Sequence, residues 1–345
     1  MSIPWRIAIP AEVRCEYVGT SQGAYYTDLE TYIYTEREFP ALFESATGYH
    51  PPGGLGVPVP AYEGVAALGG ELLFPEEHQP MIRDQGHILP TPEAVDALEA
   101  PDPWQCARFR RHVETWRALR RRFPGQAIGL SAGQEGPVTT AALLRGADFF
   151  ADCLLDPPRA LRLLSICTDT YVAFVRAVRE VTGAPQQGGV GIADDHAGNL
   201  APALWPSFVL PFYRRIYQEL GATRRSMHTE LVRRAHLPLL RELELDHVNY
   251  GENQYLTVRD AVELLDVPFD WHIKTVSEMR QGTPQQIQAT YRQAVADGAP
   301  EMVCELTVGT PVENIRAFIE MAQEYEQELH REAQSTHRGS QRQRE

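Results

Sequence analysis

The sequence predicts an α/β protein built on a parallel sheet, and three observations favour this fold class. Short apolar segments alternate with longer segments of helical spacing over most of the chain, as strands and helices do in a parallel sheet. Several of the helical segments open with proline, which the first turn of a helix tolerates. The length of 345 residues suits a single α/β barrel. The alternation alone fits either a closed barrel or an open, doubly wound sheet.

The predicted elements follow one another in strand–helix order. One strand is expected near Ile7 to Ile9, within a first hundred residues that are rich in proline, glycine and aromatic residues and are expected to be largely irregular. Further strands are predicted at Ala127–Leu130, Gly189–Ala193, Arg225–His228, His247–Tyr250, Phe269–Ile273 and Met302–Leu306. Helices are predicted at Pro157–Val181, Pro206–Leu220, Leu231–Leu243, Val258–Leu265, Pro284–Ala296 and Val312–Leu329. Residues 1–330 are taken as one domain, and the polar residues 331–345 are predicted to form a disordered tail.

Composition excludes several classes of partner. The formal net charge of −14 argues against binding to nucleic acid or to an anionic membrane surface. No apolar segment is long enough to span a bilayer, and the first residues lack a signal-peptide profile. The five cysteines are odd in number and scattered, which indicates reduced thiols and a cytoplasmic location. The pattern predicts no dinucleotide cofactor, because Gly188–Gly191 lies before and inside a strand rather than after one. No interface is legible, so the oligomeric state stays open.

Polar side chains gather where five consecutive predicted strands end. The groups are Ala193–His196, Met227–Glu230, Tyr250–Asn253, His272–Lys274 and Cys304–Glu305. In a barrel these ends converge on one face, where the site is built. We therefore expect a small-molecule site there, although each group taken alone is also explained as a surface loop.

His228, Glu230 and Cys304 form a candidate metal set at these strand ends. Imidazole, carboxylate and thiolate all bind zinc, and three protein ligands leave one position open for a substrate. Each residue also has a structural explanation. His228 is explained as a buried histidine with satisfied hydrogen bonds, Glu230 as a helix cap, and Cys304 as a small apolar core residue.

Asp194 and Asp195 are the candidate catalytic residues. Adjacent carboxylates at a strand end can position a polar substrate or act as acid and base with separated pKa values. The alternative is that Asp195 caps a turn and Asp194 faces solvent. Tyr250, Glu252 and Lys274 are candidates for substrate binding, with Lys274 facing a substrate carboxylate; an ordinary surface lysine is the competing interpretation.

Several segments resemble the uroporphyrinogen decarboxylase superfamily, and most closely its zinc-dependent, corrinoid-linked methyltransferase branch. The matching segments, which together span about two thirds of the chain, are Gly136–Gly146, Asp156–Pro158, Ala193–Asp195 with Trp205–Phe208 and Pro211–Tyr213, Gly282–Ile287, and Gly309–Ile315. The resemblance implies a (β/α)8 barrel, a zinc ion, and a corrinoid that a separate carrier protein brings to the barrel mouth. It also implies that His228 and Cys304 are zinc ligands. In that branch a cysteine stands at the position of Glu230, so the departure puts the identity of the metal in doubt.

Three functions follow from the resemblance and the residues. The first is metal-dependent transfer of a methyl group between a corrinoid and a small thiol or similar acceptor. The second is a lyase or decarboxylase acting on a small acid, in which Asp195 stabilises the cation formed on protonation. Decarboxylation of a tetrapyrrole is disfavoured, because the segment around Arg14 lacks the pair of arginines that the decarboxylase branch uses. The third is a catalytically silent barrel that serves as a binding subunit.

Overall fold

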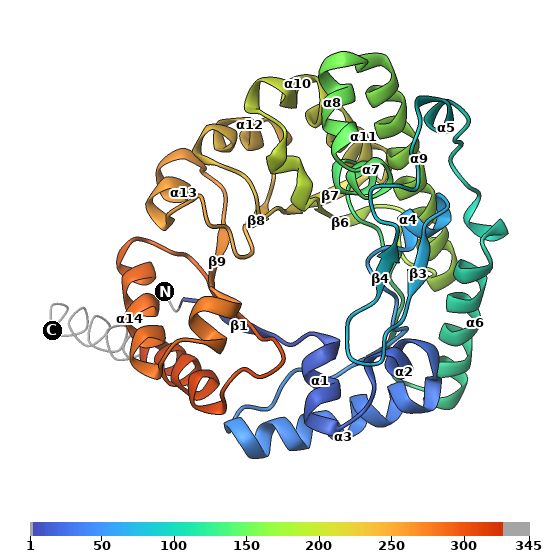
Figure 1. The fold of residues 1–345 in the computed structure, drawn as a ribbon. Coiled ribbons are helices and arrows are strands. Elements are labelled where there is room, and N and C mark those ends of the chain that lie inside the picture. Colours follow the sequence, from blue (N-terminus) through green and yellow to red (C-terminus); the bar gives the residue numbers. More distant parts are fainter. Residues whose placement is uncertain (1–2, 327–345) are drawn as a thin grey trace, which may run out of the picture.

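A curved, all-parallel sheet of six strands forms the centre of the molecule (Figure 1). The computed structural model describes residues 3–326. The strands run in the order β1-β10-β9-β8-β7-β6 across the sheet, so only β1 is out of chain order. Their bounds are β1 Trp5–Ala8, β6 Gly188–Ala193, β7 Ala222–His228, β8 His247–Asn249, β9 Phe269–Ile273 and β10 Met302–Glu305. These are the strands that apolar patterning predicts, with ends shifted by up to three residues.

The predicted closed barrel of eight strands is only partly found. Two further strands, β2 (Leu55–Gly56) and β5 (Ile128–Gly129), pair with each other in parallel and not with the six-stranded sheet. The predicted strand Ala127–Leu130 is thus reduced to two residues outside the main sheet. A short antiparallel hairpin, β3 (Glu71–Leu73) and β4 (Met81–Arg83), lies on the side of the central opening where β6 and β1 do not pair (Figure 1).

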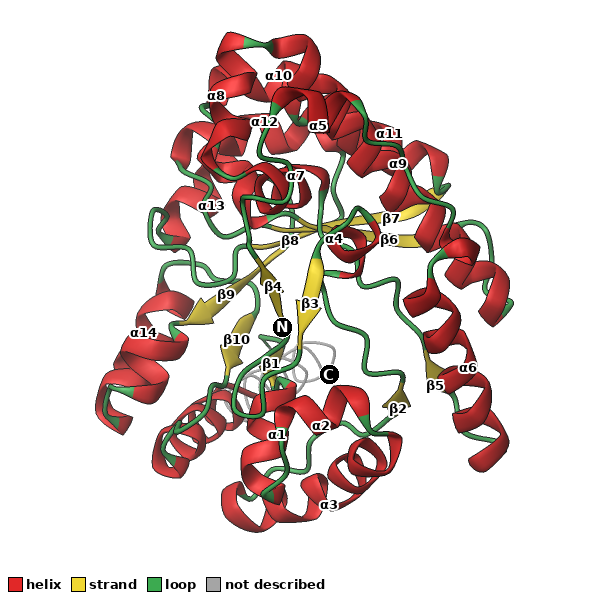
Figure 2. Ribbon diagram, turned by 45° about the vertical axis from the view of Figure 1, so that its right-hand side comes forward, coloured by secondary structure: helices red, strands yellow, loops and turns green. Residues whose placement is uncertain are grey.

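Helices surround the sheet, as Figure 2 shows. Those from residue 137 onward are α7 Pro137–Arg145, α8 Ala147–Leu155, α9 Pro157–Thr182, α10 Trp205–Phe208, α11 Leu210–Glu219, α12 Leu237–Leu240, α13 Val258–Leu264 and α14 Pro284–Ala296. Residues 312–326 are also helical. The predicted helix Val312–Leu329 therefore extends past the described residues, and the predicted disordered tail 331–345 lies outside them.

Two predicted helices are broken in the structure. Pro206–Leu220 becomes α10 and α11, which meet at Val209, and Pro211 occupies the first turn of α11. Leu231–Leu243 becomes the short helix α12 between two single 3-10 turns. Proline supplies no backbone N–H and therefore begins a new helix more readily than it continues an old one.

The N-terminal hundred residues are more regular than their composition predicts. They contain α1 (Ala11–Val18), α2 (Gln22–Thr27), α3 (Leu29–Thr47), α4 (Glu63–Ala67) and α5 (Pro92–Asp96), and α6 (Ala107–Arg122) follows. Side chains of Ser21 and Asp28 cap α2 and α3. Phe39 and Phe43 of α3 are fully buried and belong to the main core. The expectation of a largely irregular N-terminal part is wrong for these helices, because their buried aromatic residues pack them onto the rest of the domain.

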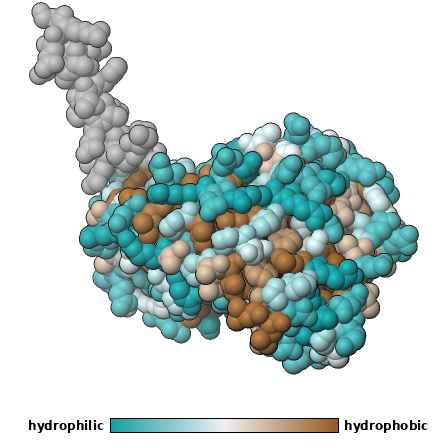
Figure 3. Space-filling view, turned by 90° about the horizontal axis from the view of Figure 1, so that it is seen from above, coloured by the Kyte–Doolittle hydropathy of each residue, from teal (hydrophilic) through white to brown (hydrophobic). Residues whose placement is uncertain are grey.

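The surface combines hydrophilic and apolar side chains. Figure 3 shows one face on which apolar residues gather among hydrophilic ones. Leu154 and Leu155, at the end of α8, are 67% and 84% exposed.

All five cysteines lie within the described residues, and each is unpaired. Among residues 3–326, no helix is long and apolar enough to cross a membrane.

Candidate active site

His228 is the last residue of β7 and stands at the centre of a polar cluster at the carboxyl ends of the strands. Its Nε2 atom lies 3.2 Å from Oδ1 of Asp195 and 3.8 Å from Oε1 of Glu230. Its Nδ1 atom lies 2.9 Å from Oδ1 of Asn249, the last residue of β8. Burial alone would lower the pKa of His228, but the hydrogen bond and negative charge of Asp195 outweigh burial and raise it to about 9. At neutral pH His228 is therefore an imidazolium, with Asp195 against its Nε2 atom.

The two neighbouring aspartates after β6 have different surroundings. Asp195 turns toward His228, and its side chain is 39% exposed. Asp194 is fully buried and accepts hydrogen bonds from the N–H of Val138 (3.0 Å) and from the N–H and hydroxyl of Thr139 (2.7 Å each). These donors belong to the first turn of α7, where unpaired N–H groups favour a carboxylate. Asp194 thus ties α7 to the end of β6, whereas Asp195 belongs to the cluster.

The close fit of Asp194 explains the glycine that precedes α7. A Cβ atom on Gly136 would lie 2.3 Å from Oδ2 of Asp194. Burial raises the pKa of Asp194 to about 6, although the hydrogen bonds from Thr139 and Val138 lower it. The predicted catalytic role of Asp194 is not supported by this position, because its oxygens are already occupied by the helix.

Glu135 is a member of the cluster that the sequence patterns missed. Burial, with the charges of Asp195 and Asp194, raises its pKa to about 8, and the charge of His228 lowers it. One carboxyl oxygen, Oε2, is buried without a hydrogen-bond partner. Glu135 is therefore a neutral carboxylic acid at neutral pH and can donate a proton. It precedes Gly136-Pro137, so the glycine–proline start of α7 was the signal that could have led to it.

Glu230 follows β7, as His228 ends it, and Glu252 and Glu305 extend the cluster to two more strand ends, those of β8 and β10. The backbone N–H of Glu252 lies 3.4 Å from Oε1 of Glu230, and Glu252 itself accepts from the N–H of Thr275. Burial raises the pKa of Glu305, the charges of Glu230 and Glu252 raise it further, and His228 lowers it. Burial also raises the pKa of Glu230, and the charge of Asp195 raises it further. The strand ends thus concentrate carboxyl groups around one imidazole.

A glycine leaves room for this arrangement after β8. Gly251 has φ +51°, in the left-handed region that favours glycine, and a Cβ atom there would lie 2.3 Å from Oε1 of Glu230. Its N–H donates to Oδ1 of Asn249 at 2.7 Å. The tight turn after β8 therefore holds the carboxylate of Glu230 against the backbone.

Cys304 lies on the opposite face of the sheet from the cluster. It is fully buried in the apolar core, and its register partners in β1 and β9 are Ile7 and Ile273, which are 6% and 0% exposed. Successive side chains of a strand point to opposite faces, so the next residue, Glu305, faces His228 instead. Burial raises the pKa of the Cys304 thiol. The sequence placed Cys304 at the correct strand end but on the wrong face.

The predicted metal set is accordingly not assembled. Among residues 3–326, no group of three or more histidine, cysteine, aspartate or glutamate side chains is arranged to hold a metal ion. His228 and Glu230 are neighbours, but Cys304 does not join them. The residues do not fit the zinc site that the family resemblance implies.

The three residues predicted to bind substrate have different positions. Glu252 is part of the cluster. Tyr250 is 1% exposed and packs against Phe269, with ring centroids 5.8 Å apart, and burial alone raises its pKa. Lys274 is exposed, and its backbone N–H donates to Glu278. The structure brings Glu252 against Glu230 of the cluster, whereas the ring of Tyr250 belongs to the core.

Polar residues also line the inside of the sheet beneath His228. A cavity of about 310 Å³ there is bordered by His228, Asn249 and Asp270, and by Arg6 and His247 among others. The Nδ2 of Asn249 donates to Oδ2 of Asp270 at 3.1 Å, and Arg6 also pairs with that oxygen. Small residues of β6, including Gly191, face this space.

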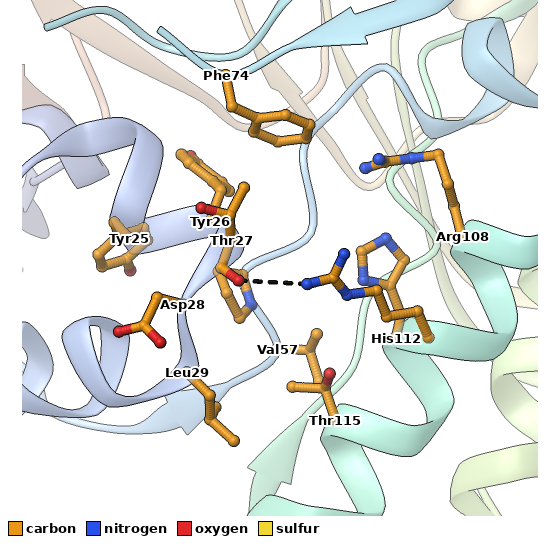
Figure 4. A pocket seen from close by; sticks show the side chains of 12 residues that line it. Tyr25, Tyr26, Thr27, Asp28, Leu29, Val57, Phe74, Arg108, His112 and Thr115 are labelled. Carbon is orange, nitrogen blue, oxygen red and sulfur yellow. Dashed lines mark hydrogen bonds between the residues drawn. The ribbon is translucent and has the colours of Figure 1, made fainter. Parts of the chain in front are cut away.

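A second pocket lies between α2 and α6 and contains none of the predicted site residues (Figure 4). Arg108 and His112 of α6 point toward it, but both are paired with the buried carboxylate of Glu63, at 2.6 and 3.0 Å. The dashed line in Figure 4 is the hydrogen bond from Arg111 to the carbonyl of Thr27, 3.2 Å long. Since Arg108, Arg111 and His112 already have partners within the protein, this pocket is a weaker candidate than the cluster around His228.

The fold and the cluster define an α/β protein with an acid–base site at the carboxyl ends of its parallel strands, the position typical of barrel enzymes. The family model for uroporphyrinogen decarboxylase (URO-D) matches residues 61–325. The chain belongs to this family, as the sequence motifs predict.

Individual relatives come from both branches. A methylated-thiol–coenzyme M methyltransferase of Methanosarcina mazei is 24% identical over 211 residues, 60% of this chain and 56% of the relative. A uroporphyrinogen decarboxylase of Xanthomonas campestris pathovar campestris is 26% identical over 245 residues, 69% of this chain and 62% of the relative. The matches therefore span less than two thirds of each relative. A solved methyltransferase structure from Methanosarcina mazei has a similar fold, with a TM-score of 0.67, 17% identity, and coverage of 94% of this chain and 93% of that one.

Proposed function

We propose that this chain is an enzyme that transfers a methyl group between a corrinoid and a small thiol, or a chemically similar molecule, bound beside His228. The observation that carries the proposal is the contact of 3.2 Å between His228 Nε2 and Asp195 Oδ1 at the ends of β7 and β6. Sequence similarity to a methylated-thiol methyltransferase supports the choice of reaction.

The imidazolium of His228 supplies the proton that demethylation of a thioether requires. When the methyl group leaves for the corrinoid, the bond between carbon and sulfur breaks and both of its electrons stay on sulfur. The sulfur takes the proton from Nε2 of His228, and the corrinoid supplies the electron pair of the new bond. In the opposite direction the thiol proton passes to His228. General acid catalysis of this kind contributes about 10²- to 10⁴-fold to a rate. No step in this proposal passes through a zinc ion.

The charges of the site favour a neutral or cationic small molecule over a polyanionic tetrapyrrole. Asp195, Glu230 and Glu305 place carboxyl groups around His228, so a substrate with several negative charges would meet an acidic cluster. Arg14 is not available to a substrate carboxylate, because its Nη1 lies 2.8 Å from Oε2 of Glu36. These contacts support the view that tetrapyrrole decarboxylation is not the reaction of this site.

A corrinoid carrier protein is the proposed partner, docked over the strand ends in the cytoplasm. Tyr255, Val276 and Val308 follow β8, β9 and β10, and they are 43%, 44% and 37% exposed. Apolar side chains around a polar mouth are a common feature of interaction surfaces. The five free cysteines are compatible with the reducing location.

The test is a corrinoid absorbance assay with purified protein, cob(I)alamin and a panel of methylated thiols. We expect methylcobalamin to form, and His228→Gln and Asp195→Asn to lower the rate by about 10²-fold or more. Glu263→Gln, at a side chain that is 64% exposed, serves as the matched control. Release of carbon dioxide from small acids, without any methyl transfer, would favour the lyase instead. Turnover of neither kind would favour a silent barrel.

A further inference from the structure

A chain of hydrogen bonds links residues of four strands beneath the cluster, and β10 lies between two of these strands. Arg6 of β1 pairs with Asp270 of β9, Asn249 of β8 donates to the same carboxylate, and His228 of β7 contacts Asn249. Asp270 has no exposed side-chain surface, so its carboxylate is removed from bulk water. Buried polar groups that are connected in this way hold one geometry.

The amide of Asn249 can be oriented in only one way by its neighbours. Its Nδ2 faces Oδ2 of Asp270 at 3.1 Å, and a carboxylate accepts hydrogen bonds but does not donate them. Its Oδ1 faces the backbone N–H of Gly251 at 2.7 Å, and an N–H donates but does not accept. Both contacts require the same assignment of oxygen and nitrogen. The oxygen therefore faces His228.

This orientation decides which ring nitrogen of His228 carries a permanent proton. An amide oxygen accepts only, so Nδ1, at 2.9 Å from it, is the N–H donor. Nε2 is then the nitrogen that gains and loses a proton, and it is the one that lies beside Asp195 and Glu230. The hydrogen bond made by one ring nitrogen commonly sets the role of the other.

We propose that Asn249 and Asp270 are positioning residues that fix the tautomer and ring orientation of His228, so that Nε2 always faces the bound substrate. The proposal deepens the function proposed above. Its geometry does not depend on which molecule binds, and it applies equally if the reaction is a decarboxylation.

The test is ¹⁵N-histidine NMR on the full chain, which contains 11 histidines. The His228 signals are assigned by their loss in His228→Gln. In the unaltered protein we expect a protected proton on Nδ1 that exchanges slowly with water. Asn249→Leu, of similar size but without an acceptor, is expected to lose this signal.

Two further variants separate positioning from packing. Asp270→Leu leaves the Asn249 amide held by Gly251 alone, so we expect the Nδ1 proton to exchange faster than in the unaltered protein but to remain visible. Asp195→Asn touches Nε2 only and is expected to leave the Nδ1 proton in place. Circular dichroism and thermal unfolding are the controls that check whether each variant is folded.

Retention of a slowly exchanging Nδ1 proton in Asn249→Leu would overturn the proposal, as would its loss in Asp195→Asn. The readout needs no turnover, so a failure of the methyl-transfer assay leaves this test intact. Where turnover is measured, Asn249→Leu is expected to lower kcat by about tenfold or more while KM stays within about twofold, because the substrate contacts Nε2 and not Asn249.

Discussion

His228 Nε2 and Asp195 Oδ1 lie 3.2 Å apart, although His228 ends β7 and Asp195 follows the end of β6. The parallel register of β6 and β7 places Ala193 opposite His228, so the residues that follow β6 meet the end of β7. An imidazolium and a carboxylate at this distance form a pair that can deliver a proton to a bound molecule. The proposed proton transfer depends on this pair, and the charges of the other carboxyl groups act on the pKa of His228.

Glu135→Gln is expected to change how stability depends on pH. The pKa of Glu135 is raised to about 8 by burial and by the charges of Asp195 and Asp194. The folded state thus holds this proton more tightly than the unfolded state, so the associated stability is present below about pH 4.5 and is lost as pH rises through 8. At pH 7 the free energy of unfolding of Glu135→Gln should therefore exceed that of the unaltered protein by up to about 3 kcal/mol.

Urea unfolding at pH 5 and at pH 8 measures this effect. The difference between Glu135→Gln and the unaltered protein should be small at pH 5 and large at pH 8. An equal difference at both values would show that Glu135 is ionised in the folded protein.

Asp194→Ala is expected to destabilise the protein by about 3 kcal/mol or more, because it leaves three buried donors without an acceptor. These are the N–H of Val138 and the N–H and hydroxyl of Thr139. Asp194→Asn keeps one acceptor oxygen and should lose less. Guanidinium unfolding compares the two variants. A fully stable Asp194→Ala would contradict the structural role assigned to this aspartate.

Cys304→Ala is expected to cost about 1 kcal/mol of stability and to leave methyl transfer within about twofold, because the thiol is packed in the core. Glu305→Gln, one residue further along β10, should alter the rate more strongly, because its side chain faces His228. Elemental analysis of the unaltered protein and Cys304→Ala provides the second readout. Stoichiometric zinc that disappears with Cys304→Ala would restore the predicted metal site.

The order of strands and most helices could be predicted from apolar spacing, and Pro284–Ala296 is found with the predicted bounds. The polar residues predicted at the strand ends include several that the structure brings together around His228, and their function as a site stays a prediction. The face of each residue could not be predicted, since a shift of one residue exchanges the two faces of a strand. For this reason the sequence predicts Cys304 as the site residue of β10, whereas in the structure Glu305 faces His228. The burial of Asp194 could not be predicted either, because it depends on contacts with the first turn of α7, more than fifty positions earlier in the sequence.

Two other features depend on contacts between segments that are distant in sequence. The helices of the N-terminal part are stabilised by packing of residues such as Phe39 and Phe43 onto the main core. Glu135 acquires its raised pKa only because folding brings it beside Asp195 and Asp194. Composition and periodicity describe local tendencies, and neither contains this information.

An NMR titration of His228 in the unaltered protein and in Asp195→Asn tests the central claim most directly. The account predicts a pKa of about 9 for His228 in the unaltered protein, held up against burial by the hydrogen bond and charge of Asp195. In Asp195→Asn, burial should dominate, and the pKa should fall by more than one unit. A pKa that does not change between the two proteins would contradict the pairing of His228 with Asp195 and the proton transfer proposed for it.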